Sequence, residues 1–124
     1  MKNVRIYSIG SCVTDTRIGR YEVVLEYGEN RRYLKKDVVD TTAHRCIIQG
    51  FIDAVKVLKY SCEVELVSTT KLGLSGLKRN KGPNVDLLKQ LVAELSLKEC
   101  EFTFSEREGE GEAIKAVINA ESEY

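Results

Sequence analysis

The side chains with the clearest chemistry in this sequence are hydrogen-bond donors of the kind that hold phosphate oxygens. Thr42, His44 and Arg45 open a long amphipathic segment, and Ser11 ends an early strand-like run. A basic cluster, Lys78-Arg79-Asn80-Lys81, lies in a glycine-containing stretch further on. Hydroxyl, imidazole and guanidinium donors of this kind position the backbone of a nucleic acid. The competing interpretation is structural: an exposed helix start for His44, packing for Arg45 and a solvated face for the basic cluster.

Acidic side chains in or near loops offer a second chemistry, which is metal binding. They are Asp15, Asp40, Glu106, Glu108, Glu110 and Glu112. Carboxylates are the ligands that Mg²⁺ prefers, but an acidic loop before a helix also complements the helix dipole. Because the second explanation needs no special geometry, we expect no metal site and no cofactor.

The four cysteines are Cys12, Cys46, Cys62 and Cys100, and their wide spacing includes no CxxC pair. No pair of histidines accompanies them, so the pattern does not indicate a zinc site. We expect them to be small buried side chains rather than disulfide partners.

The element that positions the donors is a helix over residues 41–58. Its apolar side chains recur at steps of three and four residues: Ile47, Ile48, Phe51, Ile52, Val55 and Leu58. Thr41 or Thr42 can cap its first turn. Alternation and turn residues predict strands at 4–11, 21–27, 31–38, 62–68 and 100–104, and helices at 84–97, capped by Asn84, and 113–120. Residues 70–82 are expected to be a basic loop with one irregular turn of helix.

The resulting order, β-β-β-α-β-α-β-α, predicts an α/β fold with a mixed five-stranded sheet flanked by helices. We expect a single domain over residues 1–124. Nineteen Lys and Arg balance nineteen Asp and Glu, so the chain has no overall basic field. No apolar run reaches the roughly 18 residues of a membrane helix, and the first residues do not resemble a signal peptide. We therefore expect no membrane partner and a cytoplasmic protein.

Four motifs follow one another in an order typical of a known family. They are YSIGSC at 7–12, TTAHRCII at 41–48, CEVELVST at 62–69 and NVDL at 84–87. The chain resembles ribonuclease H type 1, in which the same places typically read YTDGSC, TTNNRMEL, CEVxLxTD and NVDL. The resemblance covers nearly the whole chain and implies a ribonuclease H-like fold.

The departures from the family pattern concern its catalytic residues. The resemblance implies two Mg²⁺ ions held by four carboxylates, and it places those positions at Ile9, Ile47, Thr69 and Ile114. Hydrocarbon side chains cannot coordinate Mg²⁺, and a neutral hydroxyl is a poor ligand. The family's loop histidine falls near Arg107, whose guanidinium does not exchange protons near neutral pH. We therefore expect no catalytic residues and a pseudoenzyme of the ribonuclease H family.

Two functions remain on these grounds. The first is a catalytically inactive, non-cleaving nucleic-acid-binding module that holds an RNA–DNA hybrid or another duplex through the donors named above. The alternative is a protein-interaction or oligomerisation module, in which Ile9, Ile47 and Ile114 converge in an apolar groove that takes a protein partner or a second copy. That groove could instead be closed by neighbouring side chains. An active metal-dependent nuclease with a rebuilt acidic site is a third possibility.

Overall fold

The structure is a computed structural model, and it describes residues 1–122. Five strands form one sheet in the order β3-β2-β1-β4-β5. The strands are β1 (Lys2–Val13), β2 (Ile18–Tyr27), β3 (Asn30–Val38), β4 (Cys62–Ser68) and β5 (Glu101–Glu106). β1, β2 and β3 pair antiparallel, whereas β4 pairs parallel to β1 and β5 parallel to β4. The predicted mixed five-stranded sheet is confirmed.

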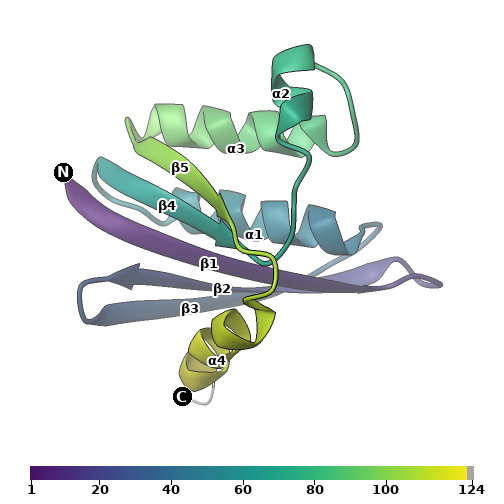
Figure 1. Ribbon diagram of the computed structural model, residues 1–124, viewed down its shortest axis with the longest axis horizontal. Helices are drawn as coiled ribbons and strands as arrows, with labels where there is room; N and C mark the ends of the chain where they lie inside the picture. Colours follow the sequence, from purple (N-terminus) through teal and green to yellow (C-terminus); the bar gives the residue numbers. More distant parts are fainter. Residues whose placement is uncertain (123–124) are drawn as a thin grey trace.

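The helices lie on both faces of this sheet. They are α1 (Ala43–Lys56), α2 (Ser75–Arg79), α3 (Val85–Leu97) and α4 (Gly111–Ser122). α1 and α3 cover one face, and α4 crosses the other near β1, β2 and β3 (Figure 1). Each helix in the described part of the chain is too short or too polar to cross a lipid bilayer.

The sheet separates two apolar clusters. The larger lies between the sheet and the helices α1 and α3, and it includes Ile6, Phe51 and Leu88. The smaller lies under α4 and consists of Tyr7, Val24, Val67, Ile114 and Ile118, with Ile9, Tyr33 and Val117 at its margin. Alternating side chains of β1 enter opposite clusters, as the two-residue period of a strand requires.

Helix α1 packs against the sheet at van der Waals distance because it carries Gly50 in its middle. A Cβ atom at this position would lie 2.6 Å from Ser8 Oγ and 2.8 Å from Val23 Cγ2. Ser8 is fully buried, and its hydroxyl donates to the Ile47 carbonyl across 2.9 Å. This contact fixes the height at which the start of α1 sits above β1.

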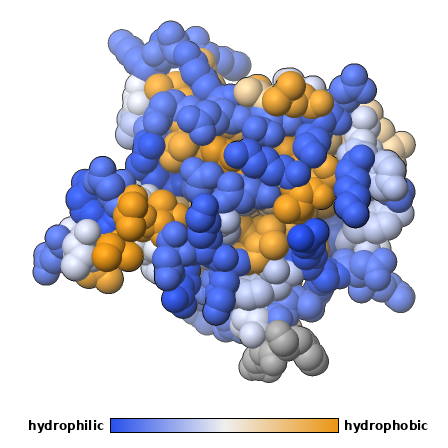
Figure 2. Space-filling model, turned by 180° about the vertical axis from the view of Figure 1, so that it is seen from behind, coloured by the Kyte–Doolittle hydropathy of each residue, from blue (hydrophilic) through white to orange (hydrophobic). Residues whose placement is uncertain are grey.

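The end of the β1–β2 hairpin projects from the body of the molecule. Val13, Ile18 and Val39 are 60%, 49% and 74% exposed there. Figure 2, which shows the molecule from behind, has hydrophobic surface where this end projects on the left. Three of the exposed large apolar side chains therefore lie at the hairpin end. Met1, Tyr27, Tyr60 and Leu97 are exposed elsewhere, and none of these side chains belongs to the predicted groove.

Candidate nucleic-acid interface

A small cavity lies at the amino end of α1, and we call it the α1 pocket. Its volume is about 250 Å³, and it is lined by Cys12, Thr14, Arg17, Thr41, Thr42 and Ala43. Thr42 is the N-cap, with extended backbone angles, and its Oγ accepts a hydrogen bond from the Arg45 amide at 3.2 Å. The predicted cap by Thr42 is confirmed, whereas Thr41 is buried and packs at the base of the pocket.

Some groups in the lining of the α1 pocket attract an anion, although most of its surface is apolar. The amino end of a helix carries partial positive charge and unpaired amide groups. Arg17 adds a guanidinium from the β1–β2 turn, where its Nε pairs with the Asp40 carboxylate at 2.9 Å. Both side chains are more than half exposed, so a phosphate oxygen can compete for this arginine at little cost. Thr14 and Arg17 were not among the predicted donors, because only the hairpin register brings them to the helix start.

Two further predicted donors, Ser11 and His44, belong to the elements that form this pocket. The Ser11 side chain faces the opposite side of the sheet from Cys12, because side chains alternate along a strand. Ser11 is exposed on β1, directly before Cys12 in the pocket wall. His44 is exposed on the first turn of α1, and its Nε2 lies 3.4 Å from the hydroxyl of Thr70. The ring therefore joins the start of α1 to the loop that follows β4.

Arg45, a further predicted donor, is held within the chain. Its guanidinium makes two hydrogen bonds to the Asp86 carboxylate, at 3.0 and 2.9 Å, and a third to Asn84 Oδ1 at 3.3 Å. The bonds from Arg45 lower the pKa of Asp86 to about 2 and raise the pKa of the arginine. Asn84 occupies the N-cap position of α3, as predicted, but its side chain makes no capping hydrogen bond: its φ is 67°, and its Oδ1 accepts from Arg45.

The basic cluster of Lys78, Arg79, Asn80 and Lys81 ends α2 and is exposed. Arg79 donates to Ser75 Oγ at 3.4 Å. Within residues 1–122, none of the cluster's cationic side chains forms an ion pair. Because Arg45 ties the start of α3 to the start of α1, α2 lies toward the same end of the molecule as the α1 pocket (Figure 1).

The three isoleucines do not form one exposed groove, and this expectation needs correction. Ile47 is 3% exposed and belongs to the cluster under α1, whereas Ile114 is 2% exposed and belongs to the cluster under α4. Ile9 lies at the margin of the second cluster. The sheet itself separates Ile47 from the other two, so neighbouring side chains close the surface that we expected to be open.

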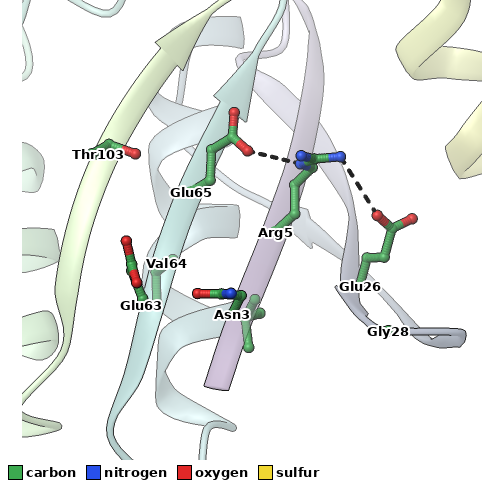
Figure 3. Close-up of a pocket in the computed structure, with 9 residues that line it drawn as sticks. Asn3, Arg5, Glu26, Gly28, Glu63, Val64, Glu65 and Thr103 are labelled. Carbon is green, nitrogen blue, oxygen red and sulfur yellow. Dashed lines mark hydrogen bonds and ion pairs between the residues drawn. The ribbon is translucent and has the colours of Figure 1, made fainter. Parts of the chain in front are cut away.

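Arg107 pairs with Glu65, which lines a polar hollow on the α4 side of the sheet. It donates to Glu65 Oε2 at 2.9 Å, and Arg5 donates to the other oxygen of Glu65 at 2.8 Å. The hollow has a volume of about 530 Å³ and is lined by Asn3, Val4, Arg5, Glu26, Gly28, Glu63, Val64, Glu65 and Thr103. Figure 3 shows Arg5 between Glu65 and Glu26, so the one arginine pairs with two of the hollow's carboxylates. Burial pushes the pKa of Glu65 upward, but the bond from Arg5 and the nearby guanidinium charges lower it overall.

The side chains at the family's metal positions do not fit Mg²⁺. Ile9, Ile47 and Ile114 offer no oxygen, and Thr69, half-buried after β4, offers one neutral hydroxyl. In the described part of the chain, no three side chains of His, Cys, Asp or Glu gather closely enough to hold a metal ion.

Comparison with known proteins bears on the resemblance directly. No family model matches the chain. Curated relatives do: ribonuclease H of Clostridium botulinum is 33% identical over 82 residues, which cover 64% of this chain and 55% of the relative. Ribonuclease H of Symbiobacterium thermophilum is 35% identical over 80 residues, 64% of this chain and 54% of the relative. Ribonuclease H of Aeromonas salmonicida is 27% identical over 117 residues, 82% of this chain and 76% of the relative. The chain thus spans about half the length of the first two relatives.

These relatives overturn one prediction. We expected a pseudoenzyme, but the proteins that the chain matches bear the name of an enzyme, and no match identifies an inactive branch. The structure has a mixed five-stranded sheet flanked by helices. On these grounds, the chain is similar to ribonuclease H, and its α/β fold is consistent with a ribonuclease H-like one.

Proposed function

We propose that this chain binds the backbone of a duplex nucleic acid, with an RNA–DNA hybrid as its first ligand, and that the α1 pocket receives a phosphate group. The observation that carries the proposal is the pocket itself: threonine hydroxyls and Arg17 surround the amino end of a 14-residue helix. The name ribonuclease H, borne by the relatives, supports RNA as one strand. A cytoplasmic location is part of the same proposal.

Some of the remaining donors extend this contact. His44 is exposed on the first turn of α1, next to Ala43 of the pocket lining, and the basic cluster at the end of α2 reaches a more distant part of the same backbone. Ser11 pairs with Arg20 in the sheet and faces away from the pocket, so it is left out of this contact. Lys78, Arg79 and Lys81 would each release a condensed counterion on contact with phosphate, which makes binding sensitive to salt. The protein-interaction role is not retained, because Ile47 and Ile114 are buried within the chain.

The test is fluorescence anisotropy at low salt with labelled RNA–DNA hybrid, double-stranded RNA and double-stranded DNA of one sequence. Arg17→Gln should weaken hybrid binding several-fold, by roughly one charge-assisted contact of about 1 kcal/mol. The matched control is Arg20→Gln. Arg20 pairs with Asp37 at 2.8 Å and is 53% exposed, against 2.9 Å and 54% for Arg17, but it lies outside the pocket.

Two results would contradict the proposal. One is the absence of binding to all three duplexes at low salt. The other is an equal loss of affinity in Arg17→Gln and Arg20→Gln, since this would assign the effect to surface charge alone. Because the relatives bear an enzyme's name, the same mixtures with Mg²⁺ are also run on a denaturing gel, where cleavage of the RNA strand would add an activity to the binding.

A further test concerns the basic cluster. The double variant Lys78→Gln, Lys81→Gln should reduce affinity for every duplex by a similar factor, because phosphate contacts do not depend on base sequence. Lys115→Gln, an exposed lysine on α4, serves as the control and should leave affinity unchanged. Identical affinities in the double variant and the parent would exclude the cluster from the interface.

A further inference from the structure

Cys62 and Cys100 come from distant parts of the sequence and meet at one end of the sheet. Cys62 begins β4, and Cys100 directly precedes β5. The parallel register pairs Glu63 with Glu101, so the two cysteines occupy neighbouring positions one residue earlier. The amide of Cys62 donates to Cys100 Sγ at 3.4 Å, which places the sulfur of one residue against the backbone of the other.

The pair is reduced in this structure, and its surroundings differ at the two sulfurs. Cys62 is 4% exposed, and its thiol donates to the Tyr60 carbonyl at 3.2 Å. Cys100 is half-buried at the margin of the larger apolar cluster and is therefore the more accessible of the two. Burial raises the pKa of the Cys62 thiol. The expectation of buried cysteines is confirmed for Cys46 and Cys62 but not for Cys12 and Cys100.

We propose that Cys62 and Cys100 are a redox modification site, at which a hydroperoxide converts the two thiols to a reversible disulfide. The more accessible Cys100 thiolate attacks the peroxide, the O–O bond breaks, and a sulfenic acid and water are formed. The Cys62 sulfur then attacks the sulfenic sulfur, the S–O bond breaks, and the oxygen leaves as a second water. The two thiol protons end in water, the sulfur pair loses two electrons, and the peroxide gains them.

The link would add a covalent bond between two segments that already meet through hydrogen bonds, among them one from Ser61 Oγ to the Lys98 carbonyl at 3.3 Å. The closed loop contains β4, α2 and α3, and with them the basic cluster. A cross-link of this length restricts the unfolded chain, and it should raise the melting temperature on the order of 10 °C. Cys62 pairs with Lys2 at the start of β1, whereas the α1 pocket lies near the other end of that strand. Oxidation should therefore leave nucleic-acid affinity unchanged, and the site does not depend on the proposed function.

The test uses the full chain, treated with a small excess of hydrogen peroxide and then alkylated. Intact mass and peptide mapping without reductant should show the loss of two hydrogen atoms and a link between Cys62 and Cys100, which dithiothreitol reverses. Cys100→Ser is the main variant because this position is only half-buried. Cys12→Ser, equally half-buried, is the matched control.

The parent and Cys12→Ser should form the link, and Cys100→Ser should not. Over-oxidation of Cys100 without a link, a disulfide that uses Cys12 or Cys46, or dimers joined between chains would each overturn the proposal. A linked protein that melts below the reduced form would also overturn it, because the strands would then not accommodate the bond.

Discussion

Ile47, near the start of α1, is part of the larger apolar cluster. It stands where the resemblance places a carboxylate, yet its side chain is 3% exposed among apolar neighbours. We predict that Ile47→Ala lowers the free energy of unfolding by roughly 2–5 kcal/mol through the cavity it leaves. Ile47→Glu should cost more, because its carboxylate would be buried without a partner. Urea denaturation measures both.

The control for this prediction is Val39→Ala, since Val39 is 74% exposed. That change should leave the free energy of unfolding within about 0.5 kcal/mol of the parent. If Ile47→Glu were as stable as the parent, the position would be open to solvent and its assignment to the core would be wrong.

Asp86 offers a prediction about pH. Its pKa is about 2 in the folded protein, against an ordinary value of 3.8, chiefly because Arg45 donates to it. A depressed carboxyl pKa adds stability above the ordinary pKa, and this stability is lost as the pH falls through 4 toward 2. The Asp86 side chain is 58% exposed, so the contribution is at most about 1 kcal/mol.

Asp86→Asn should therefore be slightly less stable than the parent at pH 7, and the difference should vanish near pH 2 in urea titrations. Asp37→Asn breaks an ion pair with a single hydrogen bond, from Arg20 Nε at 2.8 Å, on the sheet surface and serves as the comparison. An Asp86→Asn difference that persists unchanged at the lowest pH would mean that the arginine pair is not its source.

At the candidate interface, some residues could be identified from the sequence and others could not. Thr42 could be identified because capping is a local property of a helix start. Arg17 could not, because its place depends on the hairpin register that sets Val13 opposite Ile18. Arg45 was identified as a donor, but its engagement by Asp86, 41 residues away, is a tertiary contact.

At the level of elements, the packing around Gly50 predicts that Gly50→Ala destabilises the protein, whereas helix propensity alone would predict stabilisation. Alanine normally favours a helix interior over glycine by about 1 kcal/mol. Here the added methyl group would meet Ser8 Oγ and Val23 Cγ2 inside 3 Å. Gly50→Ala should therefore destabilise the protein by roughly 1–3 kcal/mol through overpacking between α1 and the sheet.

Gly111 is the matched control, because no heavy atom lies within 4 Å of a Cβ built there. Gly111→Ala at the start of α4 should be neutral or mildly stabilising in thermal and chemical denaturation. Equal effects at both glycines would show that α1 can move away from the sheet at no cost.

The elements themselves were largely predictable because their periods are strong. Ile48, Phe51 and Val55 identify the buried face of α1, and all five strands were placed. The N-cap position of α3 was predicted correctly, but Asn84 has a left-handed backbone and its side chain accepts from Arg45 instead of capping the helix. Which face of the sheet α4 covers depends on long-range packing, so the convergence of Ile47 with Ile114 was wrongly expected.

For the whole molecule, the balance of charge sets how binding should respond to salt. Nineteen cationic side chains match nineteen acidic ones, so attraction to a duplex has to come from local contacts. With Arg17, Lys78, Arg79 and Lys81 as those contacts, the logarithm of affinity should fall with the logarithm of salt concentration at a slope no steeper than about −4. A salt titration of the anisotropy measures it, and a much steeper slope would require cations that the proposal leaves out.

The smaller apolar cluster has a consequence for how the molecule opens. α4 buries only Ile114 and Ile118, whereas α1 buries eight residues against a much larger cluster. Helices with few buried contacts detach in local fluctuations that leave the rest folded. The amides of α4 should therefore exchange with deuterium well before those of α1 at neutral pH, as mass spectrometry of timed samples would show. Each such opening would briefly expose Tyr7 and Val24, so this sheet face is where a partly open chain would first associate with another.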